Sequence, residues 1–327
     1  MDVVRGLDSF RLNAAGSVLT IGNFDGVHRG HQQLLAQGCL LAADTGQPLV
    51  VLTFEPHPLS VVSAARAPTR LMTLDDKLAY LAALGAERTV VAESNRALLG
   101  MEAECFVRDV VVARFRPSHI VEGPSFGFGR GRRGNVELLR TLGQEHDFEL
   151  CVVGPIALQI EAGETVPVSS SLVRRLLEQG RAHQAALCLG RPYRLAGTVV
   201  PGHRRGRALG YPTANLAVDD VLIPEDGVYS GLAGLGDLSL PAAVSIGTAP
   251  TFGAGPRQIE AYLLDFEGDV YGQRMRLDFL RRLRPQETYR TAEALIEQMK
   301  RDVAEVRRHA HDAEVERNQN RSGSTPT

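Results

Sequence analysis

The sequence predicts two domains of different class: an α/β domain with a doubly wound parallel sheet, then a small antiparallel β-barrel with a C-terminal helix. Two observations carry this prediction. Up to about residue 180, short apolar runs alternate with helical patterns, which is typical of a parallel sheet covered by helices on both faces. Beyond about residue 190, such runs follow one another through glycine and proline turns, which favours a barrel. In parallel sheets covered by helices, ligands bind at the carboxyl ends of the strands.

The apolar runs give the elements in order. The strands expected in the first domain are Val18–Ile21, Leu49–Phe54, Thr89–Ala92, His119–Glu122 and Phe148–Val153. The helices expected there are Gln32–Ala43, Asp75–Leu84, Glu102–Arg114, Val136–Glu145 and Leu172–Gln179. The barrel strands are expected at Tyr193–Val200, Ala214–Val218, Gly227–Leu235, Ala242–Ile246, Ile259–Phe266 and Arg274–Phe279.

The chain is expected to end in one amphipathic helix, residues 291–311, followed by a polar tail that stays disordered. The apolar stripe of this helix consists of Ala294, Leu295, Met299, Val303 and Val306. The domain limits that follow are 1–182 for the first domain, 183–310 for the barrel with its helix, and 311–327 for the tail.

Composition limits the class of partner. With 44% hydrophobic and 23% charged residues, the 327-residue chain reads as a soluble globular protein with room for two cores. Its formal net charge of −2 provides no field that attracts nucleic acid or anionic lipid, so we expect a small-molecule partner. The four cysteines form no C-x-x-C pair, and no membrane span or secretory segment is recognised, so we expect a reduced, cytoplasmic protein.

The run Gly22-Asn23-Phe24-Asp25-Gly26-Val27-His28-Arg29-Gly30-His31 follows the first apolar strand and leads into a helix. Its glycines allow close backbone approach, and the free amides of a first helical turn favour anions. His28 and His31 have the spacing that puts both side chains on one helix face. These features favour a phosphate site over a loop with two surface histidines.

Three further segments are expected near this loop. Phe54-Glu55-Pro56-His57-Pro58 follows the second strand and presents His57, although a rigid turn explains its prolines equally well. Glu122-Gly123-Pro124-Ser125-Phe126-Gly127-Phe128-Gly129 follows the fourth strand, and its three glycines and two aromatic rings suit a flat ligand, or a flexible loop. Ser169-Ser170-Ser171 offers hydroxyls at a helix N-terminus, and Arg174 on its first turn can close over phosphate or face solvent.

These motifs resemble those of the bacterial bifunctional riboflavin kinase/FMN adenylyltransferase family, over about residues 16 to 307. The opening loop is similar to its H-x-G-H nucleotidylyltransferase signature, and residues 169–174 resemble its S-S-T-x-x-R motif. The resemblance implies a Rossmann-like nucleotidylyltransferase domain that transfers AMP from ATP to FMN. The residues it assigns to ATP or phosphate are Gly22, Asn23, Phe24, His28, His31, Ser169, Ser170, Ser171 and Arg174. Those assigned to the flavin are Phe54, His57, Pro58, Gly123, Ser125 and Phe126.

Within that resemblance, His28, His31 and Arg174 are the catalytic candidates, because such chemistry asks for positioning and charge neutralisation. Ser125 departs from the family, which usually carries Asp or Asn at this position. A narrower interpretation is therefore a riboflavin kinase whose adenylyltransferase domain is weakened or inactive.

In the barrel domain a basic, glycine-rich loop runs into Tyr211-Pro212-Thr213-Ala214-Asn215. Thr213 and Asn215 lie two residues apart on an expected strand, so their oxygens share one side and suit Mg²⁺, or simply satisfy a turn. The stretch resembles the riboflavin kinase signature, which implies that Thr213 and Asn215 hold Mg²⁺ with ATP. The phosphate-binding residues that the resemblance implies here are Gly202, Gly206, Arg207, Gly210, Pro212, Thr213 and Asn215.

The strand Glu260-Ala261-Tyr262-Leu263-Leu264-Asp265-Phe266 resembles the family strand that carries the catalytic carboxylate. Glu260 is therefore the candidate base for the 5′-hydroxyl of riboflavin. The expected ligands are riboflavin, FMN, FAD and ATP, with Mg²⁺ as cofactor and no nucleic acid or membrane partner. Two interpretations from other classes are flavin storage without turnover and RNA binding through the arginines of residues 130–134 and 203–207.

Overall fold

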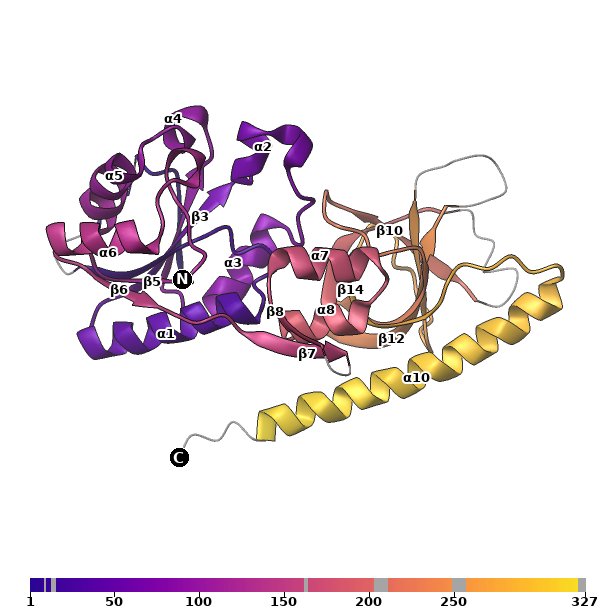
Figure 1. Ribbon diagram of the computed structural model, residues 1–327. Coiled ribbons are helices and arrows are strands. Elements are labelled where there is room, and N and C mark those ends of the chain that lie inside the picture. The colour runs from indigo at the N-terminus through magenta and orange to yellow at the C-terminus, as the bar shows by residue number, and fades with distance from the viewer. Residues whose placement is uncertain (9, 13–15, 162–163, 203–210, 249–256, 323–327) are drawn as a thin grey trace. The chain divides into compact units, whose positions relative to one another are not determined.

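The computed structural model describes residues 1–8, 10–12, 16–161, 164–202, 211–248 and 257–322 (Figure 1). It consists of two compact units, Met1–Ser170 and Ser171–Thr327. The division falls before the limit of 182 that the sequence suggested, because helices α7 (Ser170–Glu178) and α8 (Ala182–Leu189) contact the barrel. The Leu177 carbonyl accepts a hydrogen bond from the Glu225 amide, and α8 packs on strands of the barrel.

The first unit contains a six-stranded parallel sheet in the order β1-β4-β3-β2-β5-β6. The strands are β1 (Asp2–Arg5), β2 (Ser17–Ile21), β3 (Leu49–Glu55), β4 (Arg88–Glu93), β5 (Pro117–Glu122) and β6 (Glu149–Val152). The five expected strands are confirmed, and β1 is an additional edge strand with mostly exposed residues. A separate hairpin, β7 (Ala157–Glu161) with β8 (Glu164–Pro167), was also not expected.

Helices cover both faces of this sheet, which confirms the doubly wound arrangement (Figure 1). The main ones are α1 (Arg29–Thr45), α3 (Leu74–Ala83), a π-helix (Phe106–Phe115) that follows α5 (Ala103–Cys105), and α6 (Val136–Glu145). Leu35 of α1 and Leu81 of α3 belong to one apolar cluster, and Val107 of the π-helix and Leu139 of α6 belong to the other. Two short helices, α2 (Pro58–Val62) and α4 (Arg96–Leu99), lie after β3 and β4.

The capping residues explain where these helices begin and end. Thr73 caps α3 by accepting a hydrogen bond from the Asp76 amide at 3.1 Å, and Asn135 caps α6 through the Leu138 amide at 2.9 Å. Gly46 ends α1 with φ of 66°, a conformation that glycine adopts without steric cost. The expected helix over 102–114 is confirmed in place, although its hydrogen bonding is of the π type from Phe106 onward.

In the strand order, β2 lies where the connections switch sides: the chain goes on to β3 and β4 on one side of β2 and then to β5 and β6 on the other. β2 pairs with β3 on one side and with β5 on the other, so its carboxyl end adjoins the loops that leave β3 and β5. Crevices at such switch points are the usual ligand sites of open α/β sheets. Three of the four segments that the sequence singled out in this domain, those after β2, β3 and β5, begin at this edge.

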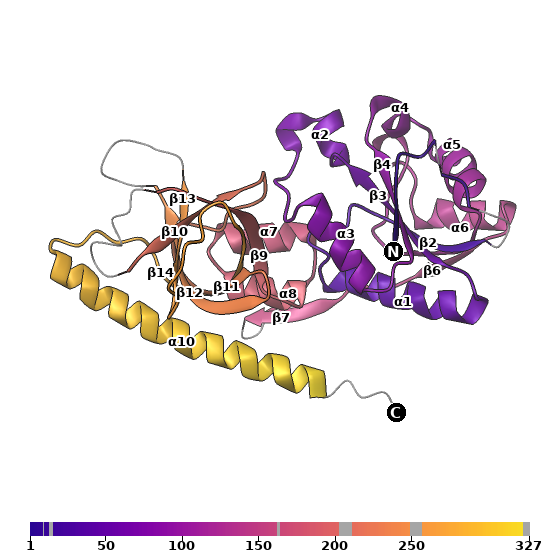
Figure 2. The same ribbon diagram turned by 180° about the vertical axis from the view of Figure 1, so that it is seen from behind.

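The second unit contains a closed antiparallel barrel in the order β10-β13-β12-β11-β14-β9 (Figures 1 and 2). Its strands are β9 (Tyr193–Val200), β10 (Thr213–Val218), β11 (Gly227–Leu235), β12 (Leu238–Gly247), β13 (Gln258–Leu263) and β14 (Arg274–Arg284). The six expected barrel strands are confirmed. Alternate residues of β9 and β13 are buried, because one face of each strand fills the barrel interior.

Helix α10 (Ala292–Ser322) lies along the outside of the barrel (Figure 2). It continues to Ser322, so the disorder expected from residue 311 is wrong for residues 311–322, where Ala, Glu and Arg support a helix despite the polar composition. Residues 323–327 lie outside the described part of the chain. None of the helices described is both long and apolar enough to cross a membrane.

Candidate active sites

The loop after β2 places the two histidines against each other. His28 precedes α1, and its Nδ1 accepts a hydrogen bond from the His31 amide at 3.4 Å. The two imidazole rings stack with centroids 3.7 Å apart and an angle of 17° between their planes. A Cβ atom at Gly30 would lie 3.2 Å from the His28 ring, so glycine leaves room for that ring. The histidines thus share one side of the N-terminus of α1, as their spacing predicts.

His31 is a neutral imidazole near neutral pH. Burial lowers its pKa well below the ordinary value, and the nearby charges of His28 and Lys77 act in the same direction. Its Nδ1 atom is buried and has no hydrogen-bond partner among the residues that the structure describes. A neutral ring beside the amides of a helix N-terminus can donate hydrogen bonds to phosphate oxygens.

Contacts from three segments fix the conformation of the loop. The Asp25 carboxylate accepts a hydrogen bond from the Leu71 amide, with distances of 2.9 and 3.2 Å to its two oxygens. The Ser170 hydroxyl donates to the Asp25 carbonyl at 2.8 Å. Asn23 Nδ2 lies 3.2 Å from His57 Nε2, which joins the loop to the segment after β3. The loop therefore has one well-defined position, which a phosphate site requires.

Lys77 on α3 adds a charge that sequence reasoning missed. Its side chain is buried with only 6% exposure, and burial lowers its pKa although the Glu55 and Asp25 carboxylates oppose that effect. Glu55 itself forms an ion pair with Arg70 at 3.2 Å. The apolar spacing of α3 indicated its buried face but not that an ammonium group occupies part of it.

The loop after β5 contains the residues expected on the flavin side. The Phe126 ring stacks on Phe128 at 5.5 Å, and the Ser125 carbonyl accepts a hydrogen bond from Arg132 at 3.2 Å. Ser125 is exposed and Gly123 has open space around it. On the β3 side, Phe54 packs against the core and His57 caps α2, whose first residue is Pro58.

The serine run differs in part from what its sequence suggested. The Ser170 hydroxyl bonds to the Asp25 carbonyl in the loop after β2, rather than serving only as a helix cap. Ser169 belongs to the first unit, whereas Ser171 and Arg174 belong to α7 in the second unit. Their contact with phosphate stays a prediction.

In the barrel, Thr213, Asn215 and Glu260 meet on neighbouring strands. Asn215 of β10 pairs directly with Glu260 of β13, and Thr213 pairs with Tyr262. The Thr213 hydroxyl donates to Glu260 Oε2 at 3.2 Å. Because alternate residues share a face, the three oxygen-bearing side chains lie together.

Gly202 lies directly against Asn215. A Cβ atom at position 202 would lie 1.9 Å from Asn215 Nδ2 and 2.5 Å from its Cγ, so any larger residue would displace the amide. Pro212 is exposed beside Thr213. Gly206, Arg207 and Gly210 lie outside the described residues.

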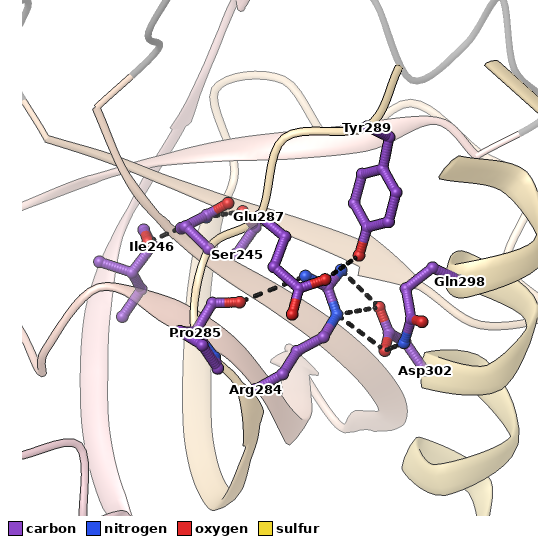
Figure 3. Close-up of polar contacts among 9 residues, drawn as sticks. Ser245, Ile246, Arg284, Pro285, Glu287, Tyr289, Gln298 and Asp302 are labelled. Atoms are coloured by element: carbon purple, nitrogen blue, oxygen red, sulfur yellow. Dashed lines mark hydrogen bonds and ion pairs between the residues drawn. The ribbon is translucent and has the colours of Figure 1, made fainter. Parts of the chain in front are cut away.

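A cavity of about 370 Å³ opens beside Glu260, between the barrel and α10. Its wall includes Thr213, Tyr262 and Ser245 from the barrel and Leu295 and Met299 from α10. Figure 3 shows polar residues of this wall, among them Ser245, Arg284, Tyr289 and Asp302. Gln286 donates to the Ser245 hydroxyl at 2.8 Å and to the Ile246 carbonyl at 3.0 Å.

Most of this wall was not predicted as part of a site. Leu295, Met299 and Val303 were assigned to an apolar stripe, and that stripe lines the cavity. Arg284, Gln286, Tyr289 and Asp302 also line it, and their sequence carries no recognisable motif. Arg284 directly precedes Pro285 at the end of β14, and this local feature could have marked it as a candidate site residue.

The comparisons with known proteins match both units of the chain. The sequence matches the family described as FAD synthetase over residues 11–171 and the family described as riboflavin kinase over residues 189–310. It is 35% identical over 309 residues to the bifunctional riboflavin kinase/FMN adenylyltransferase of Escherichia coli (strain K12), covering 94% of this chain and 97% of that protein. The protein of the same name from Pseudomonas fluorescens is 36% identical over 313 residues, covering 94% and 97%.

A solved structure supports the same architecture. The crystal structure described as a macrolide-efflux protein from Streptococcus pneumoniae matches with a TM-score of 0.83 and 26% identity, covering 94% of this chain and 99% of that one. The two family matches follow each other along the chain, and both relatives align over nearly their whole length. This chain belongs to the bifunctional riboflavin kinase/FMN adenylyltransferase family.

Proposed function

We propose that this chain phosphorylates riboflavin to FMN in its barrel unit and then adenylylates FMN to FAD in its first unit, using ATP in both reactions. The observation that carries the proposal is the meeting of Thr213, Asn215 and Glu260 on neighbouring strands, where Thr213 and Glu260 line a cavity. The cavity volume of about 370 Å³ lies within the range of small-molecule sites, and apolar and aromatic side chains in its wall suit a flat ring system.

For the kinase reaction, Glu260 acts as the base. Its carboxylate accepts the proton of the riboflavin 5′-hydroxyl while that oxygen attacks the γ-phosphorus of ATP, and the bond to the ADP oxygen breaks. The hydrogen bond from Thr213 holds the carboxylate in place. The Gly202 backbone, close to Asn215, is available to approach the phosphates.

The donor set of the barrel fits Mg²⁺. The described residues hold no group of three His, Cys, Asp or Glu side chains arranged for a metal ion. Magnesium in kinases needs few protein ligands, because water and nucleotide phosphates supply the rest, and hydroxyl and amide oxygens suit it. Thr213 and Asn215 would hold the ion, which would neutralise charge on the phosphates of ATP.

For the adenylyltransferase reaction, a phosphate oxygen of FMN attacks the α-phosphorus of ATP, and pyrophosphate leaves. His28, His31 and the N-terminus of α1 hold the phosphates of ATP, while Arg174 neutralises charge on the leaving group. No side chain needs to act as a nucleophile. The contact of 3.2 Å between Asn23 Nδ2 and His57 Nε2 supports this proposal, because it joins the loop proposed to bind ATP to a segment proposed to bind flavin.

One incubation tests the proposal. Purified protein is mixed with riboflavin, ATP and Mg²⁺, and the flavins are separated at successive times. FMN is expected to appear first and FAD to accumulate at its expense. FMN without FAD would refute the adenylyltransferase part, and unchanged riboflavin would refute the kinase part.

A further inference from the structure

Arg284 and Asp302 form a buried ion pair between the barrel and α10 at the wall of the cavity (Figure 3). Arg284 Nε lies 3.1 and 3.2 Å from the two carboxylate oxygens of Asp302, and Arg284 Nη2 lies 2.8 Å from Oδ2. The exposed fractions of the two side chains are 14% and 8%. Such a two-pronged contact fixes the direction as well as the distance between its partners.

Further bonds within the protein surround this pair. Gln298 donates to Asp302 Oδ1 at 2.9 Å, and Arg284 Nη1 donates to the Pro285 carbonyl at 3.2 Å. The guanidinium lies 5.7 Å from the centre of the Tyr289 ring, a cation–π distance. Each guanidinium nitrogen is thus engaged inside the protein, which favours a positioning role over direct binding of a phosphate.

The pair marks the point at which α10 begins to pack on the barrel. No residue in the range 292–301 is buried, whereas Asp302, Val306, His309 and Ala310 all are. Leu295 and Met299, in the unburied part, line the cavity. The first turns of α10 therefore form a wall of the cavity whose position depends on what holds the helix at Asp302.

Building on the kinase function proposed above, we infer that Arg284 and Asp302 are positioning residues for riboflavin. Their ion pair sets the distance of the α10 wall from the barrel and so the width of the cavity that receives the flavin ring. Thr213 and Glu260 line the same cavity, but they lie on β10 and β13, neither of which pairs with β14. We therefore expect the ion pair to act on flavin binding more than on ATP binding.

Substitution at this pair is expected to separate the two substrates. Asp302→Asn leaves a buried guanidinium without its counter-charge, which weakens the attachment of α10. The KM for riboflavin is expected to rise at least about tenfold, while the KM for ATP and kcat change by less than about threefold. Arg284→Lys keeps the charge but loses the two-pronged contact, and a smaller rise in the riboflavin KM is expected.

The chain offers a matched control. Arg307 of α10 forms a second ion pair with Asp265 of the barrel, with distances of 2.6 and 2.8 Å, but these side chains are 53% and 67% exposed. Asp265→Asn removes the same kind of charge from the same helix–barrel junction. Because solvent screens exposed pairs, the riboflavin KM of this variant is expected to stay at the wild-type value.

Steady-state kinetics of FMN formation by the three variants tests this inference, and thermal unfolding recorded in parallel shows whether each variant is folded. An unchanged riboflavin KM in folded Asp302→Asn overturns the inference, and so does an equal rise of both KM values, which indicates a general loss of barrel structure. If Asp302→Asn does not fold, Arg284→Lys decides by the same criteria. Absence of kinase activity in the wild-type protein refutes the proposed function, whereas active wild type with unaffected variants refutes only this inference.

Discussion

Gly202 shows how a single backbone position controls the barrel site. Its missing side chain leaves the space that the Asn215 amide occupies, since a Cβ atom there would lie 1.9 Å from Nδ2. Gly202→Ala is expected to push Asn215 away from Glu260 and to lower kcat/KM for riboflavin phosphorylation on the order of a hundredfold, because small displacements of positioning groups are costly. A coupled assay of FMN formation measures this.

Gly154→Ala is the control for that substitution, because no atom lies within 4 Å of the added methyl group. Its FMN formation is expected to match the wild type. Wild-type kinase activity in Gly202→Ala would contradict the assigned position of Asn215. Adenylylation of supplied FMN is expected to be unaffected by either change.

Glu122 gives the first unit a pH dependence of stability. The residue is 2% exposed, and its carboxyl accepts a hydrogen bond from the Ile21 amide at 2.6 Å. Burial raises its pKa well above the ordinary value, although the bond from Ile21 acts in the opposite direction. In the unfolded chain this carboxyl ionises at its ordinary pKa, whereas in the folded protein it stays protonated to higher pH. The free energy of unfolding therefore falls as the pH rises from the ordinary pKa through the raised folded pKa.

Glu122→Gln keeps an acceptor for the Ile21 amide but cannot ionise. The difference in unfolding free energy between this variant and the wild type is therefore expected to grow in favour of the variant between about pH 5 and pH 7. Urea unfolding at several pH values measures the difference. A difference that does not vary with pH would contradict a raised pKa at Glu122.

The residue-level features that the sequence could predict follow from regular backbone geometry. His28 caps α1 and stacks on His31 in the first turn, close to the shared side that their spacing predicts, and Thr213 and Asn215 share a face because strands alternate. Lys77, Arg284 and Asp302 could not be predicted in this way. Their partners lie on other elements, so their environments exist only once those elements pack.

At the scale of elements, α10 divides into parts with different roles. After Ala310 the described side chains of the helix are exposed or half-buried, so its last turns add little packing. A chain ending at Asp312 is expected to retain both activities and to lose less than about 0.5 kcal/mol of unfolding free energy. Chemical denaturation and the flavin assay measure this.

The matched truncation ends at Arg301, before Asp302. It removes the ion pair with Arg284 together with Val306 and His309, and loss of riboflavin phosphorylation is expected. A chain ending at Asp312 that lost kinase activity would show that the last turns of α10 contribute to the site.

Helices and strands with a clear apolar periodicity were predicted, whereas those that form only through packing against neighbouring elements were not. Five strands of the parallel sheet and the six strands of the barrel were predicted. β1, the β7–β8 hairpin and α8 were missed because they are short and gain stability from their neighbours. The stripe of Leu295, Met299 and Val303 was predicted correctly as the inward face of a helix. Periodicity identifies such a face but does not tell whether core or cavity lies against it.

At the scale of the whole molecule, the proposed base of the kinase reaction lies in the second unit and the two histidines proposed for adenylyl transfer lie in the first. Glu260→Gln is expected to lower riboflavin phosphorylation by at least about a hundredfold, because it removes the general base, while adenylylation of supplied FMN continues. The double variant His28→Ala with His31→Ala is expected to show the reverse. Chromatographic separation of FMN and FAD measures both, and a single substitution that removed both activities would argue against two independent sites.

Mixing these two variants tests the central claim most directly. Neither Glu260→Gln nor the His28→Ala, His31→Ala variant alone is expected to convert riboflavin into FAD with ATP and Mg²⁺. An equimolar mixture is expected to do so, because FMN made by the barrel of one protein diffuses to the first unit of the other. A mixture that forms FMN but no FAD, although each variant retains its own partial reaction, would contradict two sites that work independently.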